Sequence, residues 1–508
     1  MIVGVTARGK CSPHAVRSGK GVFILNQKEN LNDDRTGQNE KMTGSLQKDM
    51  KYLNARLAAQ ANFDVVYRVI HIGGREACIY FIDGFCKDDM MQKMLQYFMD
   101  IKPEEMPRDA HEMSKQNIPH VEVDINDKWD TIIYSFLSGV FVLLVEGFDK
   151  ALLIDSRTYP SRSVEEPDKD KVLRGSKDGF VETIVFNTAL IRRRIRSTDL
   201  RMQIMSAGNS SKTDIVICYM DSRVDKKFLA QIRHKIESIE VDALTMNQES
   251  LAECLYSRKW FNPFPKFKYT ERPDTAAAQI LEGNIIILVD NSPSAMILPT
   301  TVFDVVEEAD DYYFPPITGT YLRLTRFLIS LLTFIMTPTF LLLMNRREWI
   351  PEAFSFIVLQ EEPNIPLIWQ FLILELAIDG LRLAAVNTPT MLSTPLSVMA
   401  ALVLGEFSVK SGWFNSEVML YMAFVAIANY TQTNYEMGYA LKFMRILTLI
   451  LTAIFGVWGY AAGIVFFVLS IAVNRTVSNQ SYLYPLIPFN WNKLKGRFLR
   501  RRLPGSRK

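Results

Sequence analysis

Short apolar runs alternate with amphipathic segments from about residue 50 to residue 300, which is the pattern of an α/β fold. Within residues 50–160 the pattern predicts, in order, strands at 65–72 and 77–83, a helix at 88–101, a strand at 120–125, a helix at 128–137, and strands at 140–145 and 151–155. Within residues 200–319 it predicts strands at 202–206 and 214–220, a helix at 225–239, a strand at 240–244, a helix at 275–281, and strands at 285–289 and 295–299. We therefore expect two similar α/β subdomains.

Local matches between the two subdomains suggest duplication. The run Tyr80-Phe-Ile-Asp83 parallels Cys218-Tyr-Met-Asp221, residues 121–124 parallel 239–242, and residues 138–147 parallel 282–291. The spacings between these matches differ, so the insertions must differ as well. Chance similarity of two small α/β domains is the alternative, and we favour duplication.

The segments that flank the subdomains have a different character. Residues 1–49 are polar and without periodicity, and we expect a disordered leader. Residues 161–199 are expected to form a linker with a basic helix at 179–196. This linker contains charged residues that could contact another subunit or the membrane surface: Arg174, Asp178, Glu182, Arg192, Arg193 and Arg194. A solvated connecting helix explains the same charges, and the sequence alone favours that simpler explanation.

From residue 320 the pattern becomes one of long apolar stretches, at 321–344, 366–386, 391–409, from 416 to 430 and onward, and at 439–473. A helix needs about 20 apolar residues to cross a bilayer, so the last stretch is long enough for two crossings with a turn at Gly456 and Gly459. We therefore expect an all-α membrane domain at 320–476 with about six spans. An even number agrees with both ends of the chain lying on the same side.

Two prolines and a glycine pair modify this picture. Pro338 and Pro389 are expected to break or kink their helices because proline lacks an amide hydrogen. Gly459 and Gly463 have the spacing that lets membrane helices approach closely, although this motif is common.

One apolar stretch carries an unusual set of charges. Glu375, Asp379 and Arg382 fall on one face of the helix expected at 366–386. A charge at bilayer depth costs about 2.5–3.5 kcal/mol, so this face must meet protein or water rather than lipid. Either a water-filled, cation-attracting path or a structural salt-bridge set explains the stripe. With Arg382 neutralising one carboxylate, the second is left without a partner, which favours the path.

Three further charges lie in or near the apolar half. Glu406 lies near the end of the span expected at 391–409; we place it at the membrane interface and include it in the hypothetical ion path. Lys442 and Arg445 are expected to extend from their helix toward the interface, as long basic side chains do.

Charge and cysteine use agree with a cytoplasmic front half. The net charge is only +3, but residues 321–492 hold nine acids and nine bases, and eight bases lie in the tail at 477–508. Basic residues near a span end stay on the cytoplasmic side. We expect no signal peptide, because residues 1–10 lack an apolar region of sufficient length. The five cysteines show no CxxC spacing, so reduced thiols are expected.

Familiar catalytic patterns are absent from the sequence. The sequence contains no P-loop motif, no GxSxG elbow and no HExxH motif, and its five histidines lack ligand spacing. We expect a protein that is not an enzyme, with no cofactor, no metal and no nucleic-acid partner.

Several motifs resemble a known family. The run Arg272-Pro-Asp-Thr-Ala-Ala-Ala-Gln-Ile-Leu-Glu-Gly283 continues into Val289-Asp-Asn-Ser-Pro293 and reaches Phe314-Pro-Pro316. Together with residues 174–182 and 187–194, it resembles the A-subunit branch of the GerA spore-germination receptor family. Residues 375–385 and 404–407 resemble the branch of that family associated with stage V of sporulation.

The resemblance implies an integral protein of the spore inner membrane whose two-part N-terminal region is cytoplasmic. A-type subunits of the family resemble oligomeric ion channels that open when nutrient is sensed, and nutrient sites are assigned to a separate subunit. We therefore expect a homo-oligomeric ring that contacts membrane lipid and other germination proteins and releases monovalent cations. The alternative is a non-conducting scaffold that docks other germination proteins, including the machinery that releases dipicolinic acid.

Overall fold

The computed structural model describes residues 41–86, 88–116, 118, 122–156, 171–256, 262–387, 405–432 and 434–500. The leader at 1–40, Pro389, most of the expected span at 391–409 and the end of the tail lie outside these residues.

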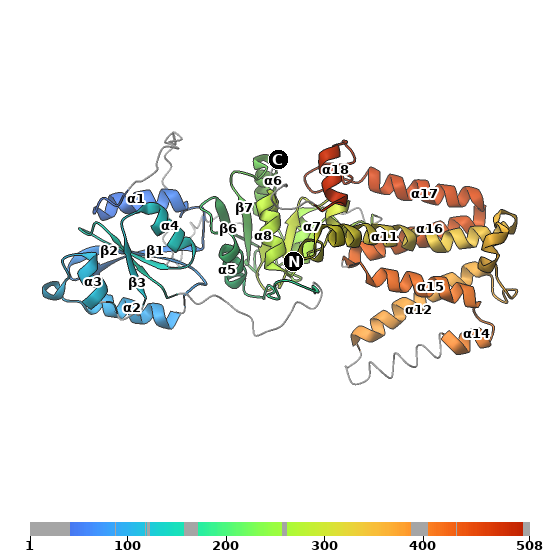
Figure 1. Ribbon diagram of the computed structural model, residues 1–508, viewed down its shortest axis with the longest axis horizontal. Coiled ribbons are helices and arrows are strands. Elements are labelled where there is room, and N and C mark those ends of the chain that lie inside the picture. Colours follow the sequence, from blue (N-terminus) through green and yellow to red (C-terminus); the bar gives the residue numbers. More distant parts are fainter. Residues whose placement is uncertain are drawn as a thin grey trace, which may run out of the picture. The chain divides into compact units, whose positions relative to one another are not determined.

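The first α/β unit is a five-stranded antiparallel sheet with helices on both faces (Figure 1). Its elements are α1 (Leu46–Leu57), β1 (Val65–Ile72), β2 (Arg75–Ile82), α2 (Asp88–Asp100), η1 (Pro103–Glu105), α3 (Ala110–Gln116), β3 (Val123–Asn126), α4 (Trp129–Leu137), β4 (Phe141–Val145) and β5 (Ala151–Ile154). Helices α1 and α4 pack on one face of the sheet, and α2 and α3 pack on the other. The strand order is β1-β2-β4-β5-β3.

The second α/β unit has the same architecture. Its elements are α5 (Ile184–Arg194), β6 (Leu200–Ala207), β7 (Thr213–Met220), α6 (Lys226–Glu237), α7 (Gln248–Leu255), β8 (Lys268–Thr270), α8 (Pro273–Glu282), β9 (Ile285–Val289) and β10 (Ala295–Leu298). The strand order is β6-β7-β9-β10-β8, which repeats that of the first sheet strand for strand. Helices α6 and α7 cover one face, and α5 and α8 cover the other.

Strand register agrees with two of the three sequence matches. In the first sheet Tyr80 pairs with Val142, and in the second Cys218 pairs with Ile286. These are equivalent positions in the matched runs at 80–83 and 138–147. The third match has no structural counterpart, because residues 239–244 form no strand and the equivalent of β3 is β8. Ile239 and Val241 instead pack against the core from an irregular segment.

Helix α5 lies where the sequence suggested a linker, but it belongs to the folded cores. It precedes β6 as α1 precedes β1, so it is the first helix of the second unit. Ile184, Leu190 and Ile191 are buried in the second unit, and Ala189 is buried in the first. A solvated connecting helix is therefore the wrong description, because one helix contributes apolar side chains to both units.

The segments at the two ends of the α/β region also differ from expectation. Leu46, predicted to lie in the disordered leader, is 2% exposed and belongs to the first core. At the other end, Val477 is buried in the core of the second unit, and α18 (Trp491–Phe498) buries Leu494 against the helical part. Residues 41–49 and 477–499 are thus parts of the folded molecule.

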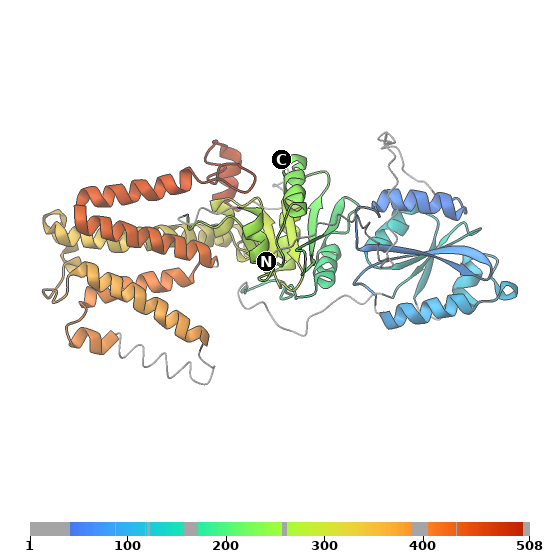
Figure 2. The ribbon, with the colours of Figure 1, turned by 180° about the vertical axis from the view of Figure 1, so that it is seen from behind.

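The helical part follows the second unit (Figure 2). Its elements are α9 (Val302–Val306), α10 (Asp310–Tyr313), α11 (Pro316–Asn345), η2 (Arg347–Trp349), η3 (Glu352–Ile357), α12 (Leu367–Asn387), α14 (Ser408–Lys410), α15 (Ser416–Tyr430), α16 (Tyr435–Phe455) and α17 (Val457–Ala472). By length and composition, α11 and α16 could each cross a membrane, while α15 and α17 are shorter apolar helices. Helix α12 is 21 residues long but carries three charges. The expectation of about six spans is not established among the described residues.

Pro338 does not break its helix. Helix α11 continues from Pro316 to Asn345 with Pro338 inside it, although proline cannot donate the usual bond to the carbonyl four residues earlier. The prediction of a helix break at this residue is therefore wrong, and a kink there stays a prediction.

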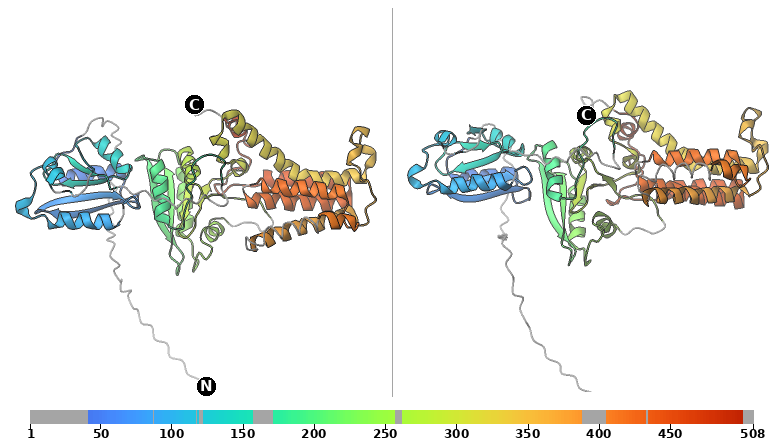
Figure 3. Two further views of the ribbon diagram at one scale, coloured as in Figure 1. Left: turned by 60° about the horizontal axis from the view of Figure 1, so that its bottom comes forward. Right: turned by 90° about the horizontal axis from the view of Figure 1, so that it is seen from below.

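The α16–α17 pair is a close antiparallel hairpin (Figure 3). Gly456, with a φ of 56°, connects the two helices in a conformation that favours glycine. A Cβ atom on Gly459 would lie 1.8 Å from the backbone oxygen of Leu451, and one on Gly463 would lie 2.6 Å from the Thr448 side chain. These two glycines therefore permit the close approach that their spacing suggested.

We expect Gly459→Ala to destabilise this hairpin by about 1–3 kcal/mol, because the methyl group forces the two helices apart. Gly380→Ala on α12 is the matched control, since among the described residues no atom beyond the neighbouring backbone of α12 lies within 4 Å of its added Cβ. The control should be neutral or stabilising by up to about 1 kcal/mol through helix propensity. Thermal unfolding of both variants in detergent compares the effects, and equal melting temperatures would contradict the close packing.

Candidate functional site

The charged residues of α12 meet two basic residues of α16. Arg445 donates to the Glu375 carboxylate through Nε at 2.7 Å and Nη2 at 2.6 Å. Lys442 lies 3.5 Å from the other oxygen of Glu375 and forms an ion pair with Asp379. Two carboxylates and two cations therefore form one group, which we call the α12–α16 ion network.

This network lies near the middle of its helices and is largely sealed within one chain. Glu375, Lys442 and Arg445 are 4%, 5% and 2% exposed. Backbone carbonyls complete the coordination of the cations: Lys442 donates to that of Glu375 at 3.1 Å and Arg445 to that of Thr333 on α11 at 3.0 Å. The Asp379 side chain keeps 29% of its surface exposed, so access to the network is from the Asp379 side.

Arg382 has a different partner from the one expected. Its guanidinium lies over the rings of Tyr430 and Tyr439, at 5.2 and 5.6 Å from their centroids. Among the ion pairs of the described residues, none joins Arg382 to Asp379. Arg382 is thus held by cation–π contacts, which contribute about 0.5–2 kcal/mol each.

The network corrects two sequence-based expectations. Lys442 and Arg445 were expected to extend to the interface, but they are buried and paired with α12. The second carboxylate of the stripe therefore has a partner, which removes the charge imbalance used to favour an ion path. Lys442 and Arg445 are three residues apart and share one helix face, and Glu375 and Asp379 are four residues apart and share another. A basic pair on one helix and an acidic pair on another were the sequence signal that could have predicted this contact.

Glu406 lies apart from the network. Its carboxylate pairs with Lys410 four residues later, and both side chains are more than half exposed. The structure therefore does not bring Glu406 together with Glu375, Asp379 and Arg382.

Two arginines of α5, Arg192 and Arg194, form ion pairs with other residues of this chain. Arg192 is 1% exposed and binds Asp64 of the first unit with two hydrogen bonds, at 2.9 and 3.1 Å. Arg194 forms an ion pair with Asp178. Although burial opposes it, this contact lowers the pKa of Asp178 below its ordinary value.

The other charges named for this region lie at the surface. Arg174, Glu182 and Arg193 are exposed, while the backbone carbonyl of Glu182 accepts from Asn291 at 2.9 Å. The charged residues expected to contact another subunit or the membrane therefore fall into two groups. Arg192 and Arg194 are committed inside the chain, and only the exposed residues remain accessible to a partner.

A second charged cluster joins the first apolar helix to the C-terminal segment. Arg323 of α11 is 2% exposed and binds Asp311 at 3.1 Å and Glu307 at 2.9 Å. It also donates to the carbonyls of Gly496 and Arg497. Burial alone would raise the pKa of Glu307, but the charges of Arg323 and Arg497 lower it below its usual value.

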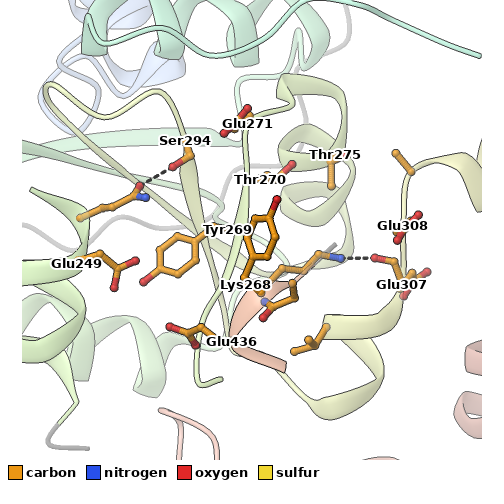
Figure 4. Close-up of a pocket in the computed structure, with 15 residues that line it drawn as sticks. Glu249, Lys268, Tyr269, Thr270, Glu271, Thr275, Ser294, Glu307, Glu308 and Glu436 are labelled. Carbon is orange, nitrogen blue, oxygen red and sulfur yellow. Dashed lines mark hydrogen bonds between the residues drawn. The ribbon is translucent and has the colours of Figure 1, made fainter. Parts of the chain in front are cut away.

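A cavity of 260 Å³ lies between the second α/β unit and the start of α16 (Figure 4). Acidic side chains, among them Glu249, Glu308 and Glu436, line several sides of it. Lys268 donates to the backbone carbonyls of Asp304 and Glu307 at 2.8 and 2.6 Å, so its charge is already engaged. No cluster of His, Cys, Asp and Glu in the described parts of the chain has the arrangement of a metal site.

Comparisons with known proteins agree with the motifs. The chain is 38% identical to stage V sporulation protein AF of Bacillus subtilis (strain 168) over 462 residues, 91% of this chain and 93% of that protein. It is 25% identical to spore germination protein KA of the same strain, over 86% of this chain and 81% of that protein. Spore germination protein GerLA of Bacillus cereus is also 25% identical, over 90% of this chain and 94% of that protein.

One solved structure is also similar. The crystal structure of the N-terminal domain of the A subunit of the Bacillus megaterium spore germinant receptor GerK3 matches 51% of this chain and 96% of that chain, with 25% identity and a TM-score of 0.40. The family model described as Bacillus/Clostridium GerA spore germination protein matches residues 51–508, which confirms the family expected from the sequence motifs. This chain therefore belongs to the GerA family of spore germination proteins.

Proposed function

We propose that this chain is an integral subunit of the germination apparatus in the spore inner membrane. In this proposal it forms a homo-oligomeric ring, conducts monovalent cations during germination and works beside other germination proteins. Its family supports the role in germination. Two long apolar helices, and large apolar side chains exposed on α11, α12, α16 and α17, support insertion into lipid.

Packing around the helical part supports placing the regions before and after it on the same side of the membrane. Before α11, the amide of Val302 donates to the carbonyl of Tyr482, which follows α17. Val477, also after α17, is buried in the second α/β unit. Because these contacts join both ends of the helical part to one folded unit, the number of crossings between them must be even. We place this unit in the cytoplasm, since the C-terminal segment is basic.

The accessible carboxylate of Asp379 is the observation that carries the conduction proposal. Glu375 is fixed by Arg445 inside the protein, whereas Asp379 keeps 29% of its surface exposed on the same helix face even though it is paired with Lys442. In a ring of identical subunits, one such carboxylate from each chain could surround a common axis. A ring of carboxylates raises the local concentration of cations.

We expect Asp379→Asn to lower K⁺ and Na⁺ conductance in planar bilayers on the order of several-fold while the oligomer still assembles. Glu348→Gln is the matched control, because Glu348 is an exposed acid outside α12. Light scattering of the purified protein checks assembly. Normal conductance in the Asp379 variant would remove this residue from the ion path.

The sealed part of the network favours a second candidate, a non-conducting scaffold that holds other germination proteins. Glu375, Arg445 and Lys442 have the burial and charge balance of a structural contact between α12 and α16. If no oligomer of the wild-type chain conducts ions in bilayers, while the protein still co-purifies with other germination proteins from spore membranes, the scaffold is the better description.

A further inference from the structure

A second cavity, of 490 Å³, lies at the C-terminal end of α17 and has a distinctive lining. Its basic and amide side chains come from two separated segments: Asn262 and Lys266 precede β8, and Asn474, Arg475 and Asn479 follow α17. Apolar side chains of α16 and α17 complete the wall. Among the described residues that line it there is no carboxylate, so its charge is positive.

Asn474 lines the cavity, and its hydrogen bonds leave its side-chain amide nitrogen without an acceptor in the described parts of the chain. Asn474 is 6% exposed, and its side-chain oxygen accepts from Asn262 at 3.1 Å and from the Lys266 ammonium. Its amide nitrogen is buried and has no hydrogen-bond partner within the described parts of the chain. A buried donor without an acceptor costs about 1–3 kcal/mol, which an acceptor entering the cavity would recover.

Two basic residues, Lys266 and Arg475, line the cavity together with Asn474. The Lys266 ammonium, on a residue 2% exposed, also donates to the carbonyl of Arg475 and lies 5.1 and 5.4 Å from the ring centroids of Tyr256 and Tyr482. Arg475 is exposed at the cavity wall. An amide donor, an ammonium group and a guanidinium group around one space are suited to an anion with several oxygen atoms.

The surface next to this cavity is apolar. Along α17, Val465, Phe466, Leu469 and Val473 expose 56%, 48%, 53% and 76% of their surfaces. Phe466 and Val473 belong to the cavity lining as well, so the polar end and the apolar helix face are continuous. A ligand that fits both has an anionic head and hydrocarbon chains.

We propose that this cavity binds the phosphate group of an anionic phospholipid, whose acyl chains lie along α17. This inference rests on the membrane location proposed above. Arg475 and the amide of Asn474 donate to the phosphate oxygens, and Lys266 supplies a fixed charge behind them. Basic pockets at the cytoplasmic ends of membrane helices bind anionic head groups in this way. The two cations select a lipid with net negative charge over a zwitterionic one.

Native mass spectrometry of the full chain in mild detergent tests the site, with phosphatidylglycerol and phosphatidylcholine as probes. We expect the wild type to bind one phosphatidylglycerol per chain with higher affinity than phosphatidylcholine. Arg475→Gln removes an exposed donor, and Asn474→Asp keeps the shape while placing a negative charge beside Lys266. Both should weaken phosphatidylglycerol binding on the order of tenfold, which corresponds to about 1.4 kcal/mol.

Arg346→Gln is the control, since Arg346 is an exposed arginine at the opposite end of α11 from the α/β region. Equal binding of the two lipids, or unchanged binding in both site variants, would overturn the inference. Inorganic phosphate that stabilises the protein as much as the lipid does would also overturn it, because the acyl chains would then contribute nothing.

Flotation with vesicles separates this inference from the proposed function. Vesicles of phosphatidylcholine alone and vesicles containing phosphatidylglycerol are each mixed with the protein during reconstitution. If the protein floats with neither, the membrane location fails, and the lipid site fails with it. If it floats with both while the lipid preference is absent in mass spectrometry, only the lipid site is overturned.

Discussion

Replacing Glu375 with alanine is expected to lower the stability of the helical part by about 3–5 kcal/mol. The change removes the carboxylate that binds Arg445, which is 2% exposed, and leaves Lys442 with Asp379 alone. A buried guanidinium without a counter-charge is among the most destabilising single defects in a protein interior. Unfolding in mixed micelles with increasing dodecyl sulfate, followed by circular dichroism, measures the loss.

A second substitution shows whether the loss comes from the unpaired charge. In Glu375→Ala with Arg445→Met both members of the pair are gone, and apolar replacement of a buried pair is often neutral or stabilising. We therefore expect the double variant to recover most of the lost stability. Glu406→Ala is the control, because that pair with Lys410 is exposed and should contribute at most about 1 kcal/mol. A Glu375 variant no weaker than this control would show that the network is not sealed.

Asp64→Ala is expected to weaken the α/β region by a similar amount, about 3–5 kcal/mol. Asp64 and Arg192 are each 1% exposed and joined by two hydrogen bonds, so the variant leaves a buried arginine unpaired between the two units. Adjacent backbone bonds link the same units, including the one from the amide of Phe63 to the carbonyl of Met202. The defect should therefore appear on both sides of the contact.

Amide hydrogen exchange of the full chain localises this effect. We expect faster exchange in β1, β6 and α5, with little change in α16 and α17. Arg193→Ala is the matched control, since Arg193 is the exposed neighbour of Arg192 on the same helix. If Asp64→Ala leaves exchange in α5 at the wild-type rate, the ion pair does not hold the two units together.

Periodicity alone located most of the elements. The strand expected at 65–72 has those bounds in the structure, and the apolar stretch expected from 416 to 430 and onward forms a helix that ends at Tyr430. The turn between the last two apolar helices is at Gly456. The predictions of these elements are correct because alternating and long apolar runs directly indicate which residues are buried. The strand expected at 240–244 is absent for a related reason: Leu244 is buried and Val241 is partly buried, but burial without a hydrogen-bonded neighbour does not make a strand.

Periodicity could not predict which charged side chains pair with one another. Glu375 and Lys442 are 67 residues apart, and no local pattern states which helices are neighbours. Arg382 shows the same limit, because its aromatic partners Tyr430 and Tyr439 come from other elements. The arginines of α5 were assigned to the surface by composition, whereas Arg192 has a buried carboxylate in the first unit.

The attachment of α18 to the beginning of α11 has a mechanical consequence. Arg323 binds acidic residues just before its own helix and, through two carbonyls, the end of the polypeptide beyond α17. Both ends of the helical part are therefore attached to each other at the contacts of Arg323. A rotation of the α/β units relative to the helical part would move the first and the last helix together. A tilt of either helix would strain the contacts that hold the other.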